Sequence, residues 1–464
     1  MRFLFINPNR YIARDNIWGV VNSITPPLGL ATLSAVLEAA GHEAEIVDAY
    51  AENLSPEQIL SFITPDTEVV GITATTPEID TAIALARVIR DHHADKKILM
   101  GGVHPTVFHK RLVEDNACDM VIRGEGEKAI LRLADRQTMK DIHNLTWKGA
   151  DGEVVVNPEG DEFVELDDLP MPAYHKLPMG KYRSAIGAAI RYPSIGMITS
   201  RGCPGKCTFC YSGMFGRKTR FLSADNVYQQ ILFLKSRYGI REISFYDDTF
   251  TANQRRVEEL CKLMLSKRLD VSWSCFARID TVNPEILKLM KKAGCHQIMY
   301  GLETTDENVL KAVNKRVKAS QYADVVAWTK NAKIDIRGAF MLGSPEETEN
   351  SMRATIEYSK KISIQYAIFN ITTPFPGTAL FSWAEENGFL SHTRWQEYDL
   401  SHAILNLPTV SPKAVEVCYR AAYKEFYFRA SYILSHLLLM KTWDSVRIHI
   451  EAARNIFTNI VKGK

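Results

Sequence analysis

Short apolar runs alternate with amphipathic segments through the first 135 residues. The apolar runs predict strands at residues 3–7, 44–47, 69–73, 98–101 and 120–122. The segments between them predict helices at 28–40, 56–63, 78–90 and 107–114. Strands that alternate with helices are typical of a doubly wound, Rossmann-like parallel sheet, in which ligands bind at the carboxyl ends of the strands. We therefore expect an α/β domain over residues 1–135.

The same alternation returns between residues 194 and 380. Strands are expected at 195–200, 242–246, 272–277, 297–300, 337–341 and 367–371. The intervening helices are expected at 224–238, 254–267, 284–292, 307–311 with 319–331, and 348–362. Six such units fit a partial (β/α)6 barrel, whose active site would lie at the carboxyl ends of the strands.

Residues 136–193 are expected to link these two domains. Segments 144–148 and 153–156 flank the Asp151-Gly152 dipeptide, which is typical of a β-hairpin turn, and residues 167–172 are proline-rich. Residues 381–464 are expected to form a helical C-terminal domain. Within it Val417, Cys418, Ala421 and Ala422 recur at helical spacing, and 432–440 is strongly apolar. That part is expected to cover the barrel opening; the alternative is a patch for a lipid-like substrate or peripheral membrane contact.

Composition limits the remaining possibilities. The 464 residues carry a net charge of only +2, with Lys and Arg dispersed, so we expect no nucleic-acid partner. The apolar start at residues 2–6 is too short for a signal peptide, and no run reaches the length of a membrane span. Eight cysteines are too few for a disulfide scaffold, and a reducing cytoplasm is the expected location.

Three of those cysteines lie together in the segment RGCPGKCTFC at residues 201–210: Cys203, Cys207 and Cys210. Thiolates select zinc, copper(I) or iron–sulfur clusters. A closed zinc site needs four ligands, yet the next thiol downstream is Cys261. Three cysteines suit a [4Fe-4S] cluster that keeps one iron open to a small molecule. The alternatives are a zinc site that borrows a distant ligand, or three ordinary buried cysteines.

This spacing, with Phe209 before the last cysteine, resembles the signature of the radical S-adenosylmethionine (SAM) superfamily. The resemblance implies that the open iron chelates the methionine end of SAM. An electron, from a donor such as flavodoxin or ferredoxin, then cleaves SAM and yields a 5′-deoxyadenosyl radical. That radical abstracts hydrogen from the substrate.

Polar motifs follow the other predicted barrel strands. The resemblance places the SAM contacts at Phe209, Asp247, Asp248, Arg278, Glu303, Gly338 and Gly343. The D-D-x-F-T stretch that begins at Asp247 would meet the methionine amine, although an aspartate there can also cap a helix. Arg278 suits the SAM carboxylate, and an ion pair with Asp280 is the competing interpretation. Glu303 would meet ribose hydroxyls or a neighbouring arginine.

The N-terminal domain has its own motifs: PPLGL at 26–30, GGVHPT at 101–106 and VIRGEGE at 121–127. In this order they resemble the cobalamin-binding domain that precedes the barrel in one radical SAM subfamily. The contacts so implied are Thr75, Thr76, Gly101, Gly102, His104, Gly124 and Glu125. The alternative is that these are turn glycines of any doubly wound domain.

A pattern that supplies histidine to cobalt, D-x-H-x-x-G, is missing. Residues 8–11 read Pro-Asn-Arg-Tyr instead. We therefore expect no histidine on the lower face of cobalamin, with residues 74–77 nearest to it. His104 is expected to cap or orient the helix that follows it.

The resulting hypothesis is a cobalamin-dependent radical SAM enzyme that transfers a methyl group to an unactivated carbon. The nearest alternative is radical cyclisation, rearrangement or ring contraction, since the subfamily includes tetrapyrrole- and hopanoid-modifying enzymes. The substrate would be a small molecule, lipid-like or tetrapyrrole. Two further alternatives are a first domain that has lost cobalamin and a non-catalytic iron–sulfur electron carrier.

Overall fold

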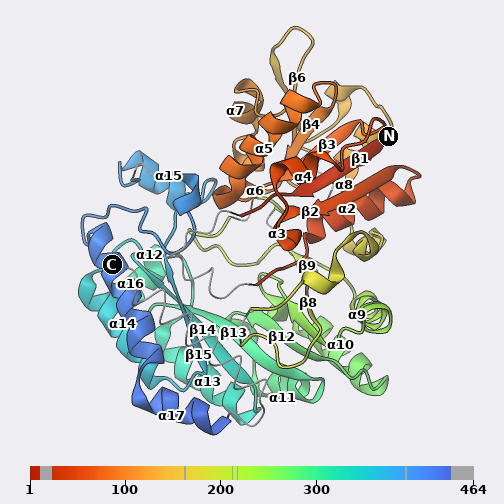
Figure 1. Ribbon diagram of the computed structural model, residues 1–464. Coiled ribbons are helices and arrows are strands. Elements are labelled where there is room, and N and C mark those ends of the chain that lie inside the picture. The colour runs from red at the N-terminus through yellow and green to blue at the C-terminus, as the bar shows by residue number, and fades with distance from the viewer. Residues whose placement is uncertain are drawn as a thin grey trace.

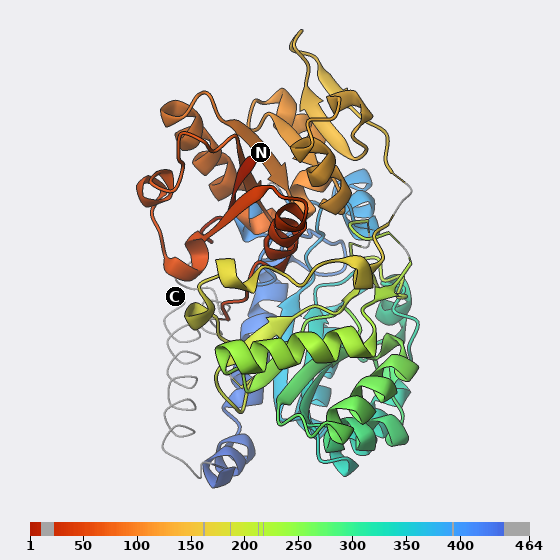
Figure 2. The same cartoon turned by 90° about the vertical axis from the view of Figure 1, so that its right-hand side faces the viewer.

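Two α/β units are stacked on one another in the computed structural model (Figure 1). The structure describes residues 1–10, 23–160, 163–185, 187–211, 213–216, 218–391 and 394–439. Residue 11 of the predicted Pro8–Tyr11 segment and Met440 of the apolar tail lie outside them. A segment around residues 163–185, which contains three short 3-10 helices, runs between the two units (Figure 2).

The first unit is a seven-stranded sheet with the order β2-β1-β3-β4-β5-β6-β7. Its strands are β1 Arg2–Asn7, β2 Glu43–Asp48, β3 Val69–Thr73, β4 Lys97–Gly101, β5 Met120–Ile122, β6 Leu145–Lys148 and β7 Val154–Val156. Its helices are α2 Leu28–Ala39, α3 Ala49–Glu52, α4 Pro56–Leu60, α5 Ile79–His92, α6 Val103–Val107, α7 His109–Glu114 and α8 Glu127–Ala134. The first five strands are parallel in the order 2-1-3-4-5, which confirms the predicted doubly wound sheet.

Burial on both faces explains why these strands read as continuous apolar runs. In β1, Phe3 and Phe5 point into one core, whereas Leu4 and Ile6 point into the other. Side chains alternate between the two faces of a strand, so each strand contributes side chains to both hydrophobic cores. Helices on the two faces then cover the sheet.

Three local details differ from the sequence prediction. The single helix expected at 107–114 is two helices that meet at Phe108, where the backbone leaves helical geometry. Helices α3 and α8 were not predicted: α3 has only 4 residues, whereas α8 is amphipathic but begins inside the glycine-containing 121–127 motif. The hairpin β6–β7, expected in the linker, extends the first sheet in antiparallel fashion.

The second unit is a six-stranded parallel sheet in the order β15-β14-β13-β12-β11-β8. Its strands are β8 Ser194–Met197, β11 Glu242–Phe245, β12 Ser272–Ala277, β13 Cys295–Glu303, β14 Asp335–Leu342 and β15 Tyr366–Ile371. The main helices are α9 Ala224–Tyr238, α10 Gln254–Ser266, α11 Pro284–Lys292, α12 Glu307–Ala312, α13 Tyr322–Asn331 and α14 Glu349–Lys361. This is the predicted half barrel.

The C-terminal helix α16 (Pro412–Tyr427) protects the free edge of this sheet at β15. The Tyr423 hydroxyl accepts from the Phe369 N–H and donates to the Phe369 carbonyl oxygen, at 3.2 and 3.0 Å. Tyr427 does the same at Ala367, at 3.2 and 2.7 Å. Two tyrosines one helical turn apart thus form hydrogen bonds with backbone groups of β15 that a further strand would otherwise have to pair.

Helix α15 (Ala379–Glu386) follows β15, and α17 (Ala430–Leu439) follows α16. In α17, Ile433 and Leu434 are exposed. No helix in the described part of the chain combines the length and apolar character that crossing a bilayer requires.

Candidate functional site at the mouth of the half barrel

The three-cysteine loop leaves the first barrel strand through β9 (Ser200–Arg201) and returns at β10 (Arg220–Phe221). Cys203 and Cys207 flank Gly205: a Cβ on that glycine would stand 3.3 and 3.9 Å from their Sγ atoms. Any larger residue at position 205 would therefore crowd both thiols. The loop lies at the carboxyl ends of the barrel strands, as predicted.

Backbone hydrogen bonds from distant segments fix this loop. The Thr208 N–H donates to the Val313 carbonyl at 3.0 Å, and the Leu380 N–H donates to the Thr208 carbonyl at 2.9 Å. The Asn314 side chain donates to the Lys206 carbonyl at 2.8 Å. The segment after α12 and the first turn of α15 thus hold the loop over the barrel.

Two cations lie beside the thiols. Arg278 Nη1 is 3.9 Å from Cys207 Sγ, and the buried Lys315 is also near Cys207. Burial raises the pKa of Cys207, and Lys315 and Arg278 act in the opposite direction. Part of Cys210 is accessible to solvent. Its thiol is nevertheless surrounded by protein, and this burial raises the pKa of the thiol to about 12. Positive charge favours the thiolate form that binds metals.

In the described part of the chain, no three His, Cys, Asp or Glu side chains gather closely enough to enclose one metal ion. The other five cysteines are all buried in the two hydrophobic cores. An iron–sulfur cluster does not need convergence at one point, because each cysteine binds a different iron. The loop therefore offers three separated thiols and no nearby fourth.

The adjacent aspartates after β11 have different surroundings. Asp247 is buried and accepts from the Thr199 N–H, the Thr199 hydroxyl and the Ser200 hydroxyl at 2.6–2.7 Å, with Arg256 4.0 Å away. Asp248 faces open space, and its pKa is raised by partial burial and by the neighbouring Asp247. Asp247 thus holds the start of the cysteine loop, whereas Asp248 is available to a ligand.

Arg278 and Glu303 are both engaged by other side chains. Arg278 forms two 2.9 Å hydrogen bonds with Asp280, so the competing interpretation of an ion pair is present while Nη1 still faces Cys207. Glu303 pairs with Lys315 rather than with an arginine. Lys315 was not predicted, because it follows a helix and belongs to no motif.

Phe209 is half-buried against the barrel core. A Cβ on Gly338 would stand 2.9 Å from Ile364 Cδ1, and Gly343 has φ +79° with Val415 of α16 packed against it. Close packing alone therefore accounts for both glycines. Their predicted contacts with adenine stay a prediction.

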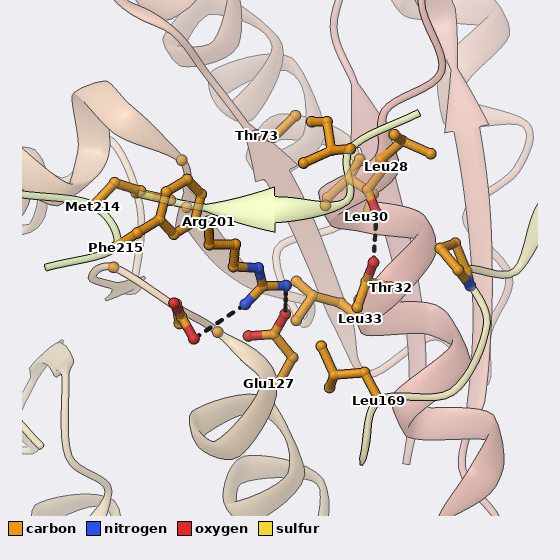
Figure 3. Close-up of a pocket in the computed structure, with 18 of the residues that line it drawn as sticks. Leu28, Leu30, Thr32, Leu33, Thr73, Glu127, Leu169, Arg201, Met214 and Phe215 are labelled. Carbon is orange, nitrogen blue, oxygen red and sulfur yellow. Dashed lines mark hydrogen bonds and ion pairs between the residues drawn. The ribbon is translucent and has the colours of Figure 1, made fainter. Parts of the chain in front are cut away.

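Glycines line a cavity of about 290 Å³ between the first sheet and the cysteine loop. Six glycines contribute to its wall: Gly29, Gly71, Gly101, Gly102, Gly124 and Gly126. Leucines of α2 form one side, and Met214 and Phe215 face them from the loop after the cysteines (Figure 3). The structure brings together the predicted Gly101, Gly102, Gly124 and Glu125 at this cavity.

An ion-pair network closes one end of the glycine-lined cavity. Arg201, next to the cysteine loop, pairs with Glu125 at 3.1 Å and with Glu127 at 2.5 Å (Figure 3). Arg220 also pairs with Glu125. The predicted Glu125 therefore connects the two α/β units. Glu127 and Arg201 lie within the quoted motifs, whereas Arg220 lies outside them, and the pairing of these residues carries no local signal.

A second cavity of about 840 Å³ extends from the first unit into the half barrel, and we call it the barrel cavity. The predicted Thr75 and Thr76 line it, as does Tyr211, which directly follows Cys210. Leu28, Ile198 and Tyr246 line both cavities. The two spaces are therefore adjacent, and they meet beside the cysteine loop.

His104 is buried beside the barrel cavity. Its Nδ1 lies 3.3 Å from Thr76 Oγ1, and its ring packs on Phe108 and Trp395 with centroids 4.7 and 5.1 Å away. Burial lowers its pKa to about 4, so it is neutral at pH 7. It makes no side-chain cap for α6 and instead joins the 74–77 segment to the C-terminal region.

Two protein-family models match the chain: "B12 binding domain" over residues 16–134 and "Radical SAM superfamily" over 197–359. An uncharacterized methyltransferase, PH0819, of Pyrococcus horikoshii is 34% identical over 425 residues, which span 90% of this chain and 91% of the relative. The anaerobic magnesium-protoporphyrin IX monomethyl ester cyclase of Rubrivivax gelatinosus is 27% identical over 399 residues, 82% of this chain and 69% of the relative.

Among solved structures, the cobalamin-dependent SAM radical enzyme OxsB, with aqua-cobalamin and SAM bound, superposes with a TM-score of 0.76. The match covers 99% of this chain and 72% of OxsB, at 15% identity. At that identity the likeness concerns the fold, and it extends over both α/β units.

Proposed function

We propose, on the premise that this chain belongs to the cobalamin-binding radical SAM enzymes, that it cleaves SAM reductively at the barrel mouth and methylates an unactivated carbon of a small molecule. Family membership rests on the two family models and on the relative that is 34% identical along nearly its whole length. The observation that carries the proposal is that the three thiols lie on one loop whose flanking residues line both cavities, Arg201 the glycine-lined cavity and Tyr211 the barrel cavity.

Cys203, Cys207 and Cys210 would hold a [4Fe-4S] cluster. The fit rests on three separated thiols on one loop, with the remaining cysteines buried elsewhere. When bound, such a cluster supplies an open iron for SAM and the electron that cleaves it. The protein fixes the loop through Val313, Asn314 and Leu380 and places two cations beside Cys207.

Asp248 and Arg278 are the side chains best placed for the methionine end of SAM. The Asp248 carboxylate has room for an ammonium group, and Arg278 Nη1 faces the cysteine loop. Asp247 acts indirectly, because protein donors already occupy both of its oxygens. Glu303 would approach the ribose with its charge balanced by Lys315.

The glycine-lined cavity fits part of a cobalamin. Glycines let a bulky ligand approach the backbone, and a Cβ would meet nothing within 4 Å at Gly29 and only the Ile122 carbonyl at 3.8 Å at Gly101, whereas Gly102 is required by packing against the Ala74 carbonyl. Gly101, Gly102, Gly124 and Glu125 would hold the ligand from this side, with Thr75 and Thr76 towards the barrel cavity. Bound cobalamin supplies the methyl group.

The domain division remains part of this proposal. Residues 1–135 would form the cobalamin domain, 136–193 the linker, 194–380 the barrel and 381–464 the helical tail. The hairpin β6–β7 belongs with the first sheet by its hydrogen bonding. We also propose a reducing cytoplasm and an electron donor such as flavodoxin or ferredoxin, both suited to an oxygen-sensitive cluster.

The test is anaerobic turnover. Protein reconstituted with iron, sulfide and hydroxocobalamin is incubated with SAM, a reductant and a small-molecule extract of the source organism, followed by mass spectrometry. The expected result is 5′-deoxyadenosine together with a product heavier by one CH₂. Deoxyadenosine without that gain favours cyclisation or rearrangement. Intact SAM in the presence of a reduced cluster would leave only the electron carrier.

A further inference from the structure

Arg337 lies inside the barrel cavity on β14. Its side chain comes from the third residue of that strand, next to Met299 of β13 and Tyr366 of β15 in the sheet. Only 8% of the residue is exposed. A guanidinium has thus been placed within the barrel, away from the surface and below the cysteine loop.

This guanidinium has no acidic partner. In the described part of the chain it forms no ion pair and no hydrogen bond, and its buried Nε lacks any acceptor. Burial lowers the pKa of Arg337, and the groups that act most strongly in the opposite direction are tyrosines. An arginine is always charged in proteins, so a buried one without a counterion is costly and rarely retained without a reason.

Arg256, in the same barrel, shows the usual arrangement. It is similarly buried, but it donates to the Thr199 carbonyl at 2.9 Å and to the Thr199 hydroxyl at 2.7 Å, with Asp247 nearby. The fold therefore supplies partners to a structural arginine. Arg337 differs because one side of it faces the cavity rather than protein acceptors.

The surroundings of Arg337 orient it and add neutral polar groups. The guanidinium carbon lies 5.4 Å from the centroid of the Tyr366 ring, a cation–π contact that fixes its plane. Ser244, Gln297 and Tyr246 line the same cavity. The acids that line it have other partners: Glu78 pairs with Arg10, and Asp399 binds Ser401 and His402.

We propose that Arg337 binds an oxyanion of the substrate, a carboxylate or a phosphate-type group, within the barrel cavity. This rests on the proposed function only in assigning the ligand as the substrate. Arginine presents a planar fork of donors that matches such groups in two-pronged fashion. The oxyanion of the substrate would then be the counterion of the Arg337 guanidinium, which has no acidic partner among the described residues.

The position of Arg337 along the strand also orients the substrate. Glu303, which pairs with Lys315 beside the cysteine loop, is level with Phe340 in the sheet. Arg337 lies three residues earlier on β14, about 10 Å at 3.3 Å per residue. The oxyanion would therefore lie at depth, and the reacting carbon would lie several bonds away towards the mouth.

The test measures anion binding to cluster-reconstituted protein by thermal unfolding at constant ionic strength. Inorganic phosphate and acetate are titrated separately against chloride, with wild type, Arg337→Met, Arg337→Lys and Arg10→Met. Arg10 is the matched control, since it lines the same cavity but is paired with Glu78. We expect Arg337→Met to weaken the preferred anion at least tenfold, Arg337→Lys to weaken it less, and Arg10→Met to leave it unchanged.

Each outcome bears on the proposal. A preference for phosphate or for acetate identifies the class of oxyanion. Equal anion responses in wild type and Arg337→Met, or no specific response in wild type, would overturn it. Competition between the anion and SAM would assign Arg337 to the cofactor and also overturn it. A structural arginine is excluded if Arg337→Met unfolds at the same or a higher temperature without anion. SAM cleavage, measured separately, tests the proposed function alone.

Discussion

The two adjoining cavities are built on opposite principles. The glycine-lined cavity gains its space by omitting side chains, and its arginine and glutamates already neutralise one another. The barrel cavity has one glycine, Gly196, among its described lining residues and leaves the charge of Arg337 without a protein counterion. Apart from Asp248, the charged side chains of the glycine-lined cavity are paired, so that cavity selects mainly by shape, whereas the unpaired buried charge of Arg337 selects by charge. The glycine-lined cavity therefore suits a tightly bound cofactor, and the barrel cavity suits a substrate that binds and dissociates in each turnover.

The largest expected effect comes from removing a cysteine of the barrel unit while the first unit is left unchanged. Replacing Cys203, Cys207 or Cys210 by alanine removes a thiolate ligand, and we expect complete loss of cluster assembly and of SAM cleavage. Iron content, the visible spectrum and 5′-deoxyadenosine release measure this. Cobalamin binding should persist, and Cys418→Ala in α16 is the control. Full iron content in any loop variant would refute the ligand assignment.

The reciprocal change fills the glycine-lined cavity. Gly29 is in the first turn of α2, and nothing lies within 4 Å of where its Cβ would stand. Gly29→Leu should therefore fold, yet weaken cobalamin binding at least about tenfold, the factor that corresponds to 1.4 kcal/mol. SAM cleavage should remain. Gly180→Leu, equally unhindered and outside both cavities, is the control. Equal cobalamin binding by the two variants would contradict the assignment.

A third change breaks the ion-pair network that connects the two α/β units at the glycine-lined cavity. Arg201→Met leaves Glu127 and part of Glu125 as buried charges without their partner, and we expect a loss of about 3 kcal/mol in the free energy of unfolding. Urea denaturation measures it. Arg255→Met removes an exposed pair with Glu259 and should cost no more than about 0.5 kcal/mol. Similar losses in both variants would show that the network contributes no special stability.

The smallest expected effect concerns pH. The pKa of His104 is about 4 in the folded state, below the ordinary value of 6.5, because its ring is buried. Between pH 6.5 and 4 the unfolded chain therefore binds the proton first, and stability falls as pH falls. The upper bound on this contribution is about 3.4 kcal/mol, since the pKa falls from 6.5 to about 4 and each pKa unit corresponds to 1.36 kcal/mol. His104→Gln should remove this slope from urea unfolding curves, and the exposed His92→Gln should retain it.

Much of this could be predicted from local pattern. Apolar alternation predicted the two parallel sheets and nearly all their strands, because burial on both faces imposes that pattern within a few residues. The spacing of Cys203, Cys207 and Cys210 predicted their joint placement on one loop. The glycine motifs predicted a ligand cavity at the ends of β4 and β5. The four-residue helix α3 was missed for lack of length, and the amphipathic α8 was missed although its pattern was present.

The sequence by itself determined the elements and the chemical types present: three clustered thiols, glycines at strand ends, and acids and bases near the barrel mouth. Only the tertiary structure decided which charges are neutralised. Asp247 and Asp248 are neighbours in the chain, yet Asp247 is bonded to Thr199, 48 residues away, while Asp248 stays available. Arg201 finds Glu127 across 74 residues, and Arg337 finds no acid among the described residues. Periodicity and spacing are local properties, whereas the state of a charge depends on what the fold brings beside it.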